Sequence, residues 1–342
     1  MPSIPLVVWT SKGLHCAAGD FYIDPHRGVD TAIVTHAHSD HARKGSRRYI
    51  CAGSGEELLR TRLGAKIVVE PWEFGRRYRL GDVEVSLHPA GHILGSAQVR
   101  IQRGSEVWVA SGDYKRDPDP SCEPFESVTC DTFITEATFG TPRYAWDKNA
   151  SHGAAISAWW EEAAARGKNC LLYGYSLGKA QRILAELAPY AQRPVLIHRT
   201  MWELTECYRR QGLVLAPTED LLSRLEDGPP LDGEMILAPP SIVKDFGERL
   251  GHYETAFASG WMQGSGSFRT GGYDRGFVMS DHADWPDLNR TILETGAKRV
   301  FVQHRDGALV RHLRGLGIAA HSIDVLTPET YPFWGGEAQA LL

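Results

Sequence analysis

The chain has 342 residues, a length typical of two domains or of one large domain carrying an insertion. It is 42% hydrophobic and 23% charged and contains 10 Trp, 12 Tyr and 11 Phe, which excludes intrinsic disorder and a fibrous architecture. Because Lys and Arg total 37 and Asp and Glu total 42, the net charge is −5, so any binding of a polyanion must be local.

Compartment and redox state follow from two further features. The longest early apolar run, residues 4–9, is far shorter than a membrane span and lacks the flanks of a secretory signal. We therefore expect a cytoplasmic protein with no membrane partner. The six cysteines are scattered without a C-x-x-C pair, which predicts reduced and mostly buried thiols.

Short strands are predicted through the first part of the chain, because β-branched residues recur there between Gly, Asp and Pro. We expect them at 6–9, 21–23, 31–35, 66–69, 83–87, 97–101, 107–110 and 132–135. Apolar residues at helical spacing predict a helix over 153–166. Strands at 171–174 and 195–198 then alternate with helices at 180–187 and 200–211. Near the end of the chain, strands are expected at 277–279 and 300–303 and helices at 286–295 and 308–316. Such alternation is typical of parallel strands joined by crossover helices.

The 14 histidines are the unusual feature of the composition, and several cluster directly after a predicted strand. The strand at 31–35 runs into His36-Ala-His38-Ser-Asp40-His41. Residues two apart in an extended segment point to the same side, so His36 and His38 can bind one ion together. If a helix begins after the serine, Asp40 and His41 project toward a second ion. Borderline divalent cations prefer imidazole and carboxylate ligands, so the segment predicts a metal site rather than a polar surface turn.

Two later segments complete this candidate site. His92 lies between glycines in Gly-His-Ile-Leu-Gly-Ser, where the backbone can pass close to a metal centre. Asp113 follows the apolar strand at 107–110. Either residue alone would suit an ordinary turn, but downstream of the histidine cluster both become candidate ligands. A carboxylate that bridges two cations is what a two-metal hydrolase needs to hold the ions about 3.5–4 Å apart.

The pattern His36-x-His38-x-Asp40-His41, then His92, then Asp113, resembles the metallo-β-lactamase superfamily in its two-metal hydrolase form. Asp24 matches the early aspartate of that superfamily, which supports the ligands from outside the coordination sphere. The resemblance implies two divalent ions, Zn²⁺ or Mn²⁺, and ligand type does not decide between them.

Three further segments resemble the β-CASP branch of that superfamily, which consists of nucleic-acid-processing nucleases. They are Thr-Glu136-Ala-Thr-Phe-Gly, Ser-Asp-His282-Ala-Asp-Trp and His304 after the strand at 300–303. The resemblance implies that His304 is the last ligand of the second ion and that His282 is the general acid. Glu136 then orients His282. A histidine is suited to the acid role because it can donate a proton near neutral pH.

A possible phosphate site lies in Tyr-Ser176-Leu-Gly178-Lys179, which joins a predicted strand to a helix. Such a junction offers backbone N–H groups, a hydroxyl and an ammonium. The motif is short and also suits a simple helix cap. It resembles the segment that holds a 5′-phosphate in the DNA cross-link-repair nucleases.

Residues 135–139, 175–183 and 277–285 are similar to the bacterial ligase-associated DNA exonucleases. In relatives the last histidine is usually followed by Gly, whereas Arg305 follows it here. The resemblance implies a 5′-to-3′ exonuclease on single-stranded DNA in DNA repair, with a DNA ligase or helicase as a functional associate. His36, His38, His92 and Asp113 would hold one ion, and Asp40, His41, Asp113 and His304 the other, so that Asp40 and Asp113 take part in the chemistry.

Three other functions remain open from the sequence. An RNA-processing nuclease of the same branch would use the same metals and acid. A small-molecule hydrolase is disfavoured by Glu136, His282 and the long central insertion. A non-catalytic binding subunit would show degraded ligands, and none is degraded.

The fold implied by the resemblance is an α/β four-layer αβ/βα sandwich formed by residues 1–150 and 275–342. A compact β-CASP-like αβ domain is expected as an insertion at 151–274, roofing the metal cleft.

Overall fold

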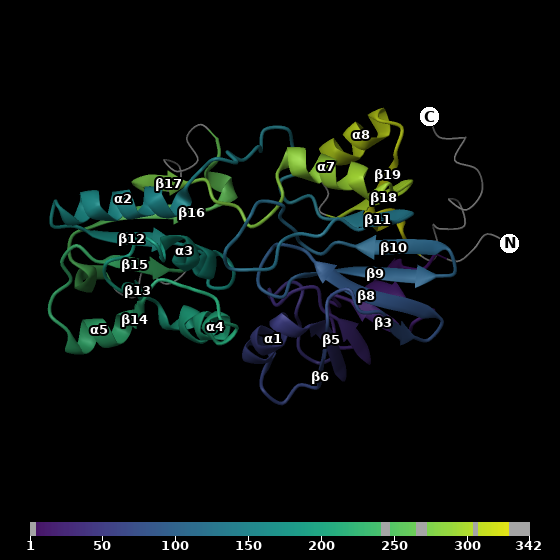
Figure 1. Cartoon of the computed structure of the whole chain (residues 1–342), viewed down its shortest axis with the longest axis horizontal. Coiled ribbons are helices and arrows are strands. Elements are labelled where there is room, and N and C mark those ends of the chain that lie inside the picture. The colour runs from purple at the N-terminus through teal and green to yellow at the C-terminus, as the bar shows by residue number, and fades with distance from the viewer. Residues whose placement is uncertain (1–4, 241–246, 265–271, 304–306, 328–342) are drawn as a thin grey trace. The chain divides into compact units, whose positions relative to one another are not determined.

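The computed structural model describes residues 5–240, 247–264, 272–303 and 307–327. The chain divides into two compact units (Figure 1). The first comprises Met1–Arg116, Glu123–Pro142 and His282–Leu342, and the second comprises Asp117–Cys122 and Arg143–Asp281. The second unit extends beyond the predicted 151–274 on both sides and also takes in a short earlier segment.

The first unit contains two sheets. One has the order β1-β2-β3-β4-β5-β6 and the other β19-β18-β11-β10-β9-β8-β7. The strands of the first sheet are β1 Val8–Thr10, β2 Gly13–Cys16, β3 Phe21–Ile23, β4 Thr31–Ile33, β5 Arg48–Ala52 and β6 Val69–Trp72. Those of the second are β7 Tyr78–Leu80, β8 Val83–Pro89, β9 Ala97–Arg103, β10 Glu106–Ala110, β11 Thr132–Thr135, β18 Arg299–Val302 and β19 Ala319–Ser322.

The two sheets pack face to face around one apolar core, to which Phe21 and Ile50 of the first sheet and Val99 and Trp108 of the second contribute. Helix α1 (Glu56–Leu63) covers the outer face of the first sheet through Leu59. Helices α7 (Trp285–Thr295) and α8 (Gly307–Gly315) cover the outer face of the second sheet (Figure 1). The first unit is therefore an αβ/βα sandwich, as predicted.

The topology brings the ends of several strands to one edge of the second sheet. Strands β10, β11 and β18 are mutually parallel, so their carboxyl ends lie together. Asp113 follows β10, Glu136 follows β11, and Gln303 follows β18. The predicted site residues Asp113 and Glu136 thus reach the same edge, at which β18 also ends.

The second unit is a six-stranded parallel sheet of order β14-β13-β15-β12-β16-β17. Its strands are β12 Asn169–Tyr173, β13 Val195–Ile197, β14 Thr218–Asp220, β15 Met235–Ala238, β16 Tyr253–Ala258 and β17 Arg275–Phe277. Its helices are α2 His152–Ala164, α3 Lys179–Leu187, α4 Arg199–Arg210 and α5 Leu221–Asp227. Helices α2, α3 and α4 share one core with the sheet, and α5 belongs to a separate core.

Short 3-10 helices complete the description: η1 Gly53–Gly55, η3 Gly247–Leu250, η4 Gly260–Met262 and η5 Ile323–Val325. One strand differs clearly from its prediction, since β6 spans Val69–Trp72 instead of 66–69. Its pairing with β5 begins only at Val69. Pro71 is tolerated inside β6 because this strand forms the edge of its sheet.

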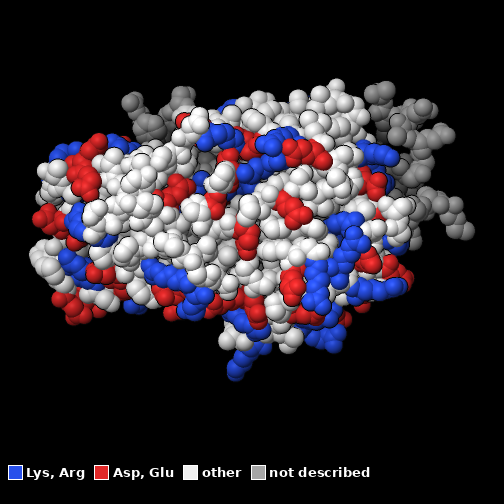
Figure 2. All heavy atoms as spheres, in the orientation of Figure 1, with Lys and Arg blue, Asp and Glu red and all other residues white. Residues whose placement is uncertain are grey.

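The surface and the thiols agree with the composition. Basic and acidic side chains are interspersed over the face shown in Figure 2, as expected for a net charge of −5. All six cysteines are free, and all but Cys122 are buried. Among the residues that the structure describes, no helix is both long enough and apolar enough to cross a membrane.

Candidate metal centre

Three histidine rings converge at the edge of the first unit. His36 and His38 lie in the irregular segment that follows β4, and residues 39–41 form a turn, so the helix considered after the serine does not begin there. His36 Nε2 lies 3.0 Å from His38 Nδ1, and His92 Nε2 lies 3.1 Å from the same atom. Asp113 Oδ2 lies 3.6 Å from His36 Nε2 and 3.8 Å from His92 Nε2. The four side chains therefore offer donor atoms that all lie within 4.8 Å of one another.

A second group lies on the other side of Asp113. His41 Nε2 is 3.3 Å from Asp113 Oδ2 and 3.7 Å from Asp40 Oδ2, and the Asp40 side chain is 68% exposed. Asp113 thus faces both groups, as expected for a bridging carboxylate. His304 and Arg305 lie outside the described residues.

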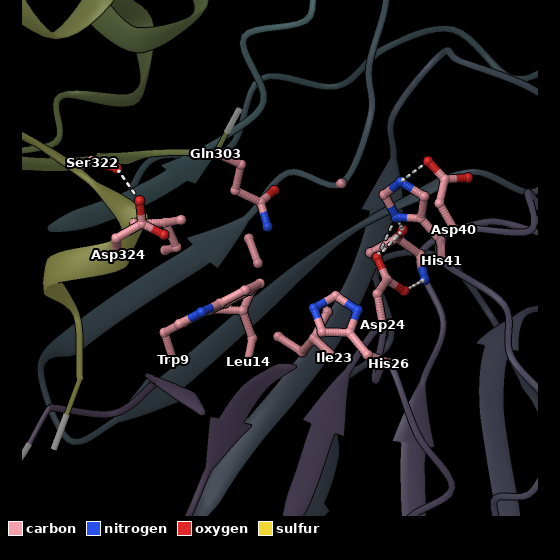
Figure 3. A pocket seen from close by; sticks show the side chains of 14 residues that line it. Trp9, Leu14, Ile23, Asp24, His26, Asp40, His41, Gln303, Ser322 and Asp324 are labelled. Atoms are coloured by element: carbon pink, nitrogen blue, oxygen red, sulfur yellow. Dashed lines mark hydrogen bonds and ion pairs between the residues drawn. The ribbon is translucent and has the colours of Figure 1, made fainter. Parts of the chain in front are cut away.

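A cavity of about 540 Å³ adjoins this second group. Asp24, Asp40 and His41 form one of its walls, while Trp9 and Gln303 lie across the cavity from them (Figure 3). Gln303 directly precedes His304 in the chain. The ligands of the second group therefore border open space rather than packed core.

Asp24 fixes the orientation of His41, as the predicted supporting aspartate should. Its Oδ2 accepts a hydrogen bond from His41 Nδ1 at 2.7 Å, which leaves Nε2 turned toward Asp113 and Asp40. Asp24 holds a left-handed backbone conformation with φ 43°, which an aspartate tolerates better than most residues. When the far N–H of a ligating histidine donates a hydrogen bond to a carboxylate, the bond fixes the ring and its tautomer.

Thr35 is a supporting residue that the sequence reasoning missed. Its backbone N–H and its hydroxyl donate to the two carboxylate oxygens of Asp24 at 2.8 and 2.6 Å. The same hydroxyl oxygen lies 3.1 Å from His36 Nδ1. The only sequence signal was its position directly before His36.

The pKa values of His36 and His41 are shifted in opposite directions by their surroundings. Burial holds the pKa of His36 well below its usual value, and the neighbouring histidines lower it further. Burial alone would also lower the pKa of His41, but Asp113 and Asp24 raise it well above the usual value. Burial would raise the pKa of Asp113, yet His41 and nearby histidines hold that pKa well below its usual range. Asp113 is therefore a carboxylate and His36 a neutral imidazole at pH 7, the forms in which both bind metals.

The donor set fits divalent metal ions. His38 Nδ1 lies 3.0 Å from Nε2 of His36 and 3.1 Å from Nε2 of His92, and the rings of His36 and His92 are buried. Because His36 is neutral, nitrogen lone pairs come together here. A cation between them satisfies all of these atoms at once, whereas hydrogen bonds alone satisfy only some of them. His36, His38, His92 and Asp113 can hold one ion, and Asp40, His41 and Asp113 can contribute to a second.

His282 and Glu136 lie beside this cluster. Glu136 is completely buried, and its Oε2 lies 2.9 Å from His282 Nδ1. Its Oε1 accepts a hydrogen bond of 2.6 Å from the backbone N–H of Tyr114, which follows Asp113. The His282 ring is 23% exposed and lies 4.6 Å from the His92 ring, centroid to centroid. One buried carboxylate therefore fixes both the imidazole and the backbone next to a metal ligand.

The predicted phosphate segment lies in the second unit, at the start of α3. Ser176 is partly exposed, and its hydroxyl lies 3.4 Å from that of Thr200. The backbone N–H of Gly178 donates to Gln181 Oε1 at 2.8 Å. Lys179 is only 2% exposed, and its ammonium donates to Asp281. This placement differs from the predicted phosphate contact, because the charge of Lys179 is already balanced inside the unit.

No family model matches the chain. It is 32% identical over 324 residues to a probable DNA ligase of Opitutus terrae, covering 94% of this chain and 31% of that protein. It is 28% identical over 205 residues to ribonuclease TTHA0252 of Thermus thermophilus, covering 51% of this chain and 46% of that one. It is 30% identical over 131 residues to endoribonuclease ysh1 of Emericella nidulans, covering 36% of this chain and 14% of that one. The chain thus spans less than half of each of these curated relatives.

A solved structure shares the fold. It is a protein of unknown function from Enterococcus faecalis V583, with a TM-score of 0.52 and 13% identity over 80% of this chain and 74% of that one. The relatives and the His/Asp cluster together confirm the family expected from the motifs. The chain belongs to the β-CASP branch of the metallo-β-lactamase superfamily.

Proposed function

We propose that this chain is a metal-dependent nuclease that degrades single-stranded DNA from the 5′ end. The observation that carries the proposal is the convergence of buried His36, His92 and Asp113 with half-buried His38, beside the His282–Glu136 pair. Zn²⁺ or Mn²⁺ suits this mixture of imidazole and carboxylate donors. When bound, a pair of such ions acidifies water and neutralises charge on phosphoryl oxygens.

The chain's own residues supply the remaining chemistry. Glu136 holds His282 by Nδ1, so Nε2 is the atom that delivers a proton to the departing 3′-oxygen. Asp24 holds His41 in the same manner, and Asp113 faces both ligand groups. These side chains are placed before substrate arrives, which reduces the reorganisation needed in the transition state.

DNA is favoured over RNA as the substrate, because the relative named for DNA matches a larger share of this chain than the relatives named for RNA do. The relative named a probable DNA ligase matches 94% of the chain, whereas the two ribonucleases match 51% and 36%. Only the match to the first of these therefore spans nearly all of both units. An RNA-processing nuclease is the second candidate, because two of these relatives carry that name. The name of the relative called a probable DNA ligase also supports joint action with a DNA ligase in DNA repair.

A single strand is favoured by exposed aromatic side chains in the second unit. Tyr175 follows β12 and is 51% exposed, and Trp261 follows the adjacent strand β16 and is 45% exposed. Their rings offer faces on which unpaired bases stack. Ser176 lies next to Tyr175 and is the candidate contact for a 5′-phosphate.

The test is a metal-supplemented assay on uniformly labelled single-stranded DNA and RNA of matched sequence, each with a 5′-phosphate or a 5′-hydroxyl. We expect mononucleotides from DNA at the earliest times, faster cleavage with the 5′-phosphate, and no cleavage after chelation. Preferred cleavage of RNA would instead establish the second candidate. Hydrolysis of lactams or thioesters with both nucleic acids intact would overturn the proposal.

A further inference from the structure

A buried cluster of charged side chains lies at the amino end of α3 in the second unit. Lys179 and Arg182 of this helix are 3% and 6% exposed at their side chains. The acids that face them are Asp119, Asp281 and Glu186, whose side chains are 3%, 8% and 15% exposed. The proposed chemistry uses none of these five residues.

The two cations bind one short stretch of chain. Lys179 Nζ donates to the carbonyl oxygen of Met279 at 2.6 Å and to Asp281 Oδ1 at 2.7 Å. Arg182 Nη1 donates to the carbonyl oxygen of Ser280, and it lies 3.5 Å from the same Asp281 oxygen. Residues 279, 280 and 281 are therefore all held through charge-assisted hydrogen bonds.

Arg182 also binds two other acids. Its Nε lies 3.5 Å from Asp119 Oδ2 and 3.0 Å from Glu186 Oε1. Burial alone would lower the pKa of Arg182, but Asp119 and Asp281 raise it above its usual value. The guanidinium thus stays charged and links the segment 279–281 to Asp117–Cys122 within the second unit.

The segments held by this cluster lie at points where the chain crosses between the two units. The chain passes from the second unit to the first between Asp281 and His282, and it leaves the first unit after Arg116, shortly beyond Asp113. The cluster therefore fixes the residue directly before the proposed acid. The carbonyl oxygens of Met279 and Ser280 and the side chain of Asp281 are all held, so the backbone leading up to His282 has little freedom to rotate.

We propose that Lys179 and Arg182 are positioning residues for His282, acting through Asp281, and that they do not contact a substrate phosphate. The inference rests on the proposed function, in which His282 is the acid. A phosphate at Lys179 would have to displace Asp281 and be buried in its place. The cluster instead limits the orientations from which His282 can pair with Glu136.

The test compares Lys179→Met and Asp281→Asn with wild type on single-stranded DNA carrying either a 5′-phosphate or a 5′-hydroxyl. We expect kcat to fall about tenfold with KM within about twofold, by the same factor on both substrates. Lys179→Arg should restore part of kcat, because it keeps the charge and the donors. Glu254→Gln is the matched control, since Glu254 forms ion pairs with Arg166 and Lys168 elsewhere in the unit.

A second readout does not depend on activity. The imidazole nitrogen NMR signals of His282, assigned with His282→Ala, should shift in metal-free Asp281→Asn and stay in place in Glu254→Gln. The His282 signals of Asp281→Asn test the inference even if Lys179→Met fails to fold. Unchanged signals and unchanged kcat in Asp281→Asn would overturn the inference, and so would a rise in KM confined to the 5′-phosphorylated substrate. An inactive wild type would refute the proposed function instead.

Discussion

The two units each contain a buried polar cluster, and the clusters are built in opposite ways. In the first unit the nitrogens of His36, His38 and His92 face one another at 3.0 and 3.1 Å. In the second unit each cation faces a carboxylate, as Lys179 faces Asp281 at 2.7 Å. The first cluster gathers donors that a cation from outside completes, whereas the second is complete within the chain.

This difference separates a site for chemistry from a device that holds the backbone. A buried group of lone pairs is costly unless a ligand satisfies it, so it indicates a binding site. A buried ion pair with hydrogen bonds to carbonyl oxygens already satisfies its own members. Variants of one cluster or the other should therefore differ in metal content and in turnover.

The largest effect is expected from Asp113→Asn. Asp113 faces both ligand groups, so its loss should weaken the binding of both ions and reduce nuclease turnover by about a thousandfold or more. Metal content by mass spectrometry and initial rates on single-stranded DNA check this. Asp281→Asn removes a comparably buried carboxylate from the other cluster and should retain full metal content. Loss of metal in both variants would erase the distinction between the clusters.

Much of the first cluster could be predicted from the sequence, because its ligands lie at the ends of strands with clear β patterns. The strands predicted at 31–35 and 132–135 are present as Thr31–Ile33 and Thr132–Thr135, and His36 and Glu136 follow them closely. Parallel pairing then brings Asp113 and Glu136 to the same edge. Local pattern and one topological rule were sufficient.

The second cluster was not predicted, because its key pair joins residues 102 positions apart. From the sequence, Lys179 lies in a junction that suits a phosphate as well as a helix cap. Only the fold shows that the chain after β17 places Met279 and Asp281 against α3. There the carbonyl oxygen of Met279 and the carboxylate of Asp281 bind the ammonium of Lys179. A charged residue directly before His282 was the available signal, but a lone aspartate after a strand is equally typical of a surface turn.

The next largest effect is expected from His282→Ala. Removing a general acid should lower turnover by about 100- to 10,000-fold while both metals stay bound, since His282 is not among the ligands that we propose. Rates and metal content are measured on the same preparation. His88→Ala is the matched control, because His88 also pairs with a glutamate, Glu126, at 3.0 Å. An unchanged rate in His282→Ala would contradict the assignment of the acid.

Metal-linked stability should also distinguish the clusters. A ligand present at 100 times its dissociation constant stabilises the folded state by about 2.7 kcal/mol. We expect Zn²⁺ to raise the free energy of unfolding of wild type and of Asp281→Asn by similar amounts. Asp113→Asn should gain much less. Denaturant titrations with and without zinc measure this, and an equal gain in all three proteins would place the metal elsewhere.

The smallest effect concerns pH, and its sign follows from His41. Asp113 and Asp24 raise the pKa of His41 well above its usual value, so the metal-free protein keeps a proton there at neutral pH. An ion that uses His41 must displace this proton, so its affinity should rise by up to about tenfold per pH unit until the pH passes that raised pKa. An ion that binds His36 displaces no proton from that ring, because the lowered pKa of His36 keeps it neutral. Acidification from neutral pH should therefore release the ion at His41 before the one at His36.

Asp24→Asn sharpens this last comparison. Without the charge of Asp24, the pKa of His41 should fall toward its ordinary value, so the pH midpoint for binding the second ion should move to lower pH. Zinc titrations at a series of pH values, from below the ordinary histidine pKa of about 6.5 upward, measure both midpoints. The midpoint of the ion at His36, His38 and His92 should change less, because Asp24 is joined to His36 through the Thr35 hydroxyl, whereas it binds His41 directly. Equal movement of both midpoints would show that the two ligand groups titrate as one cluster and that His41 has no separate proton to lose.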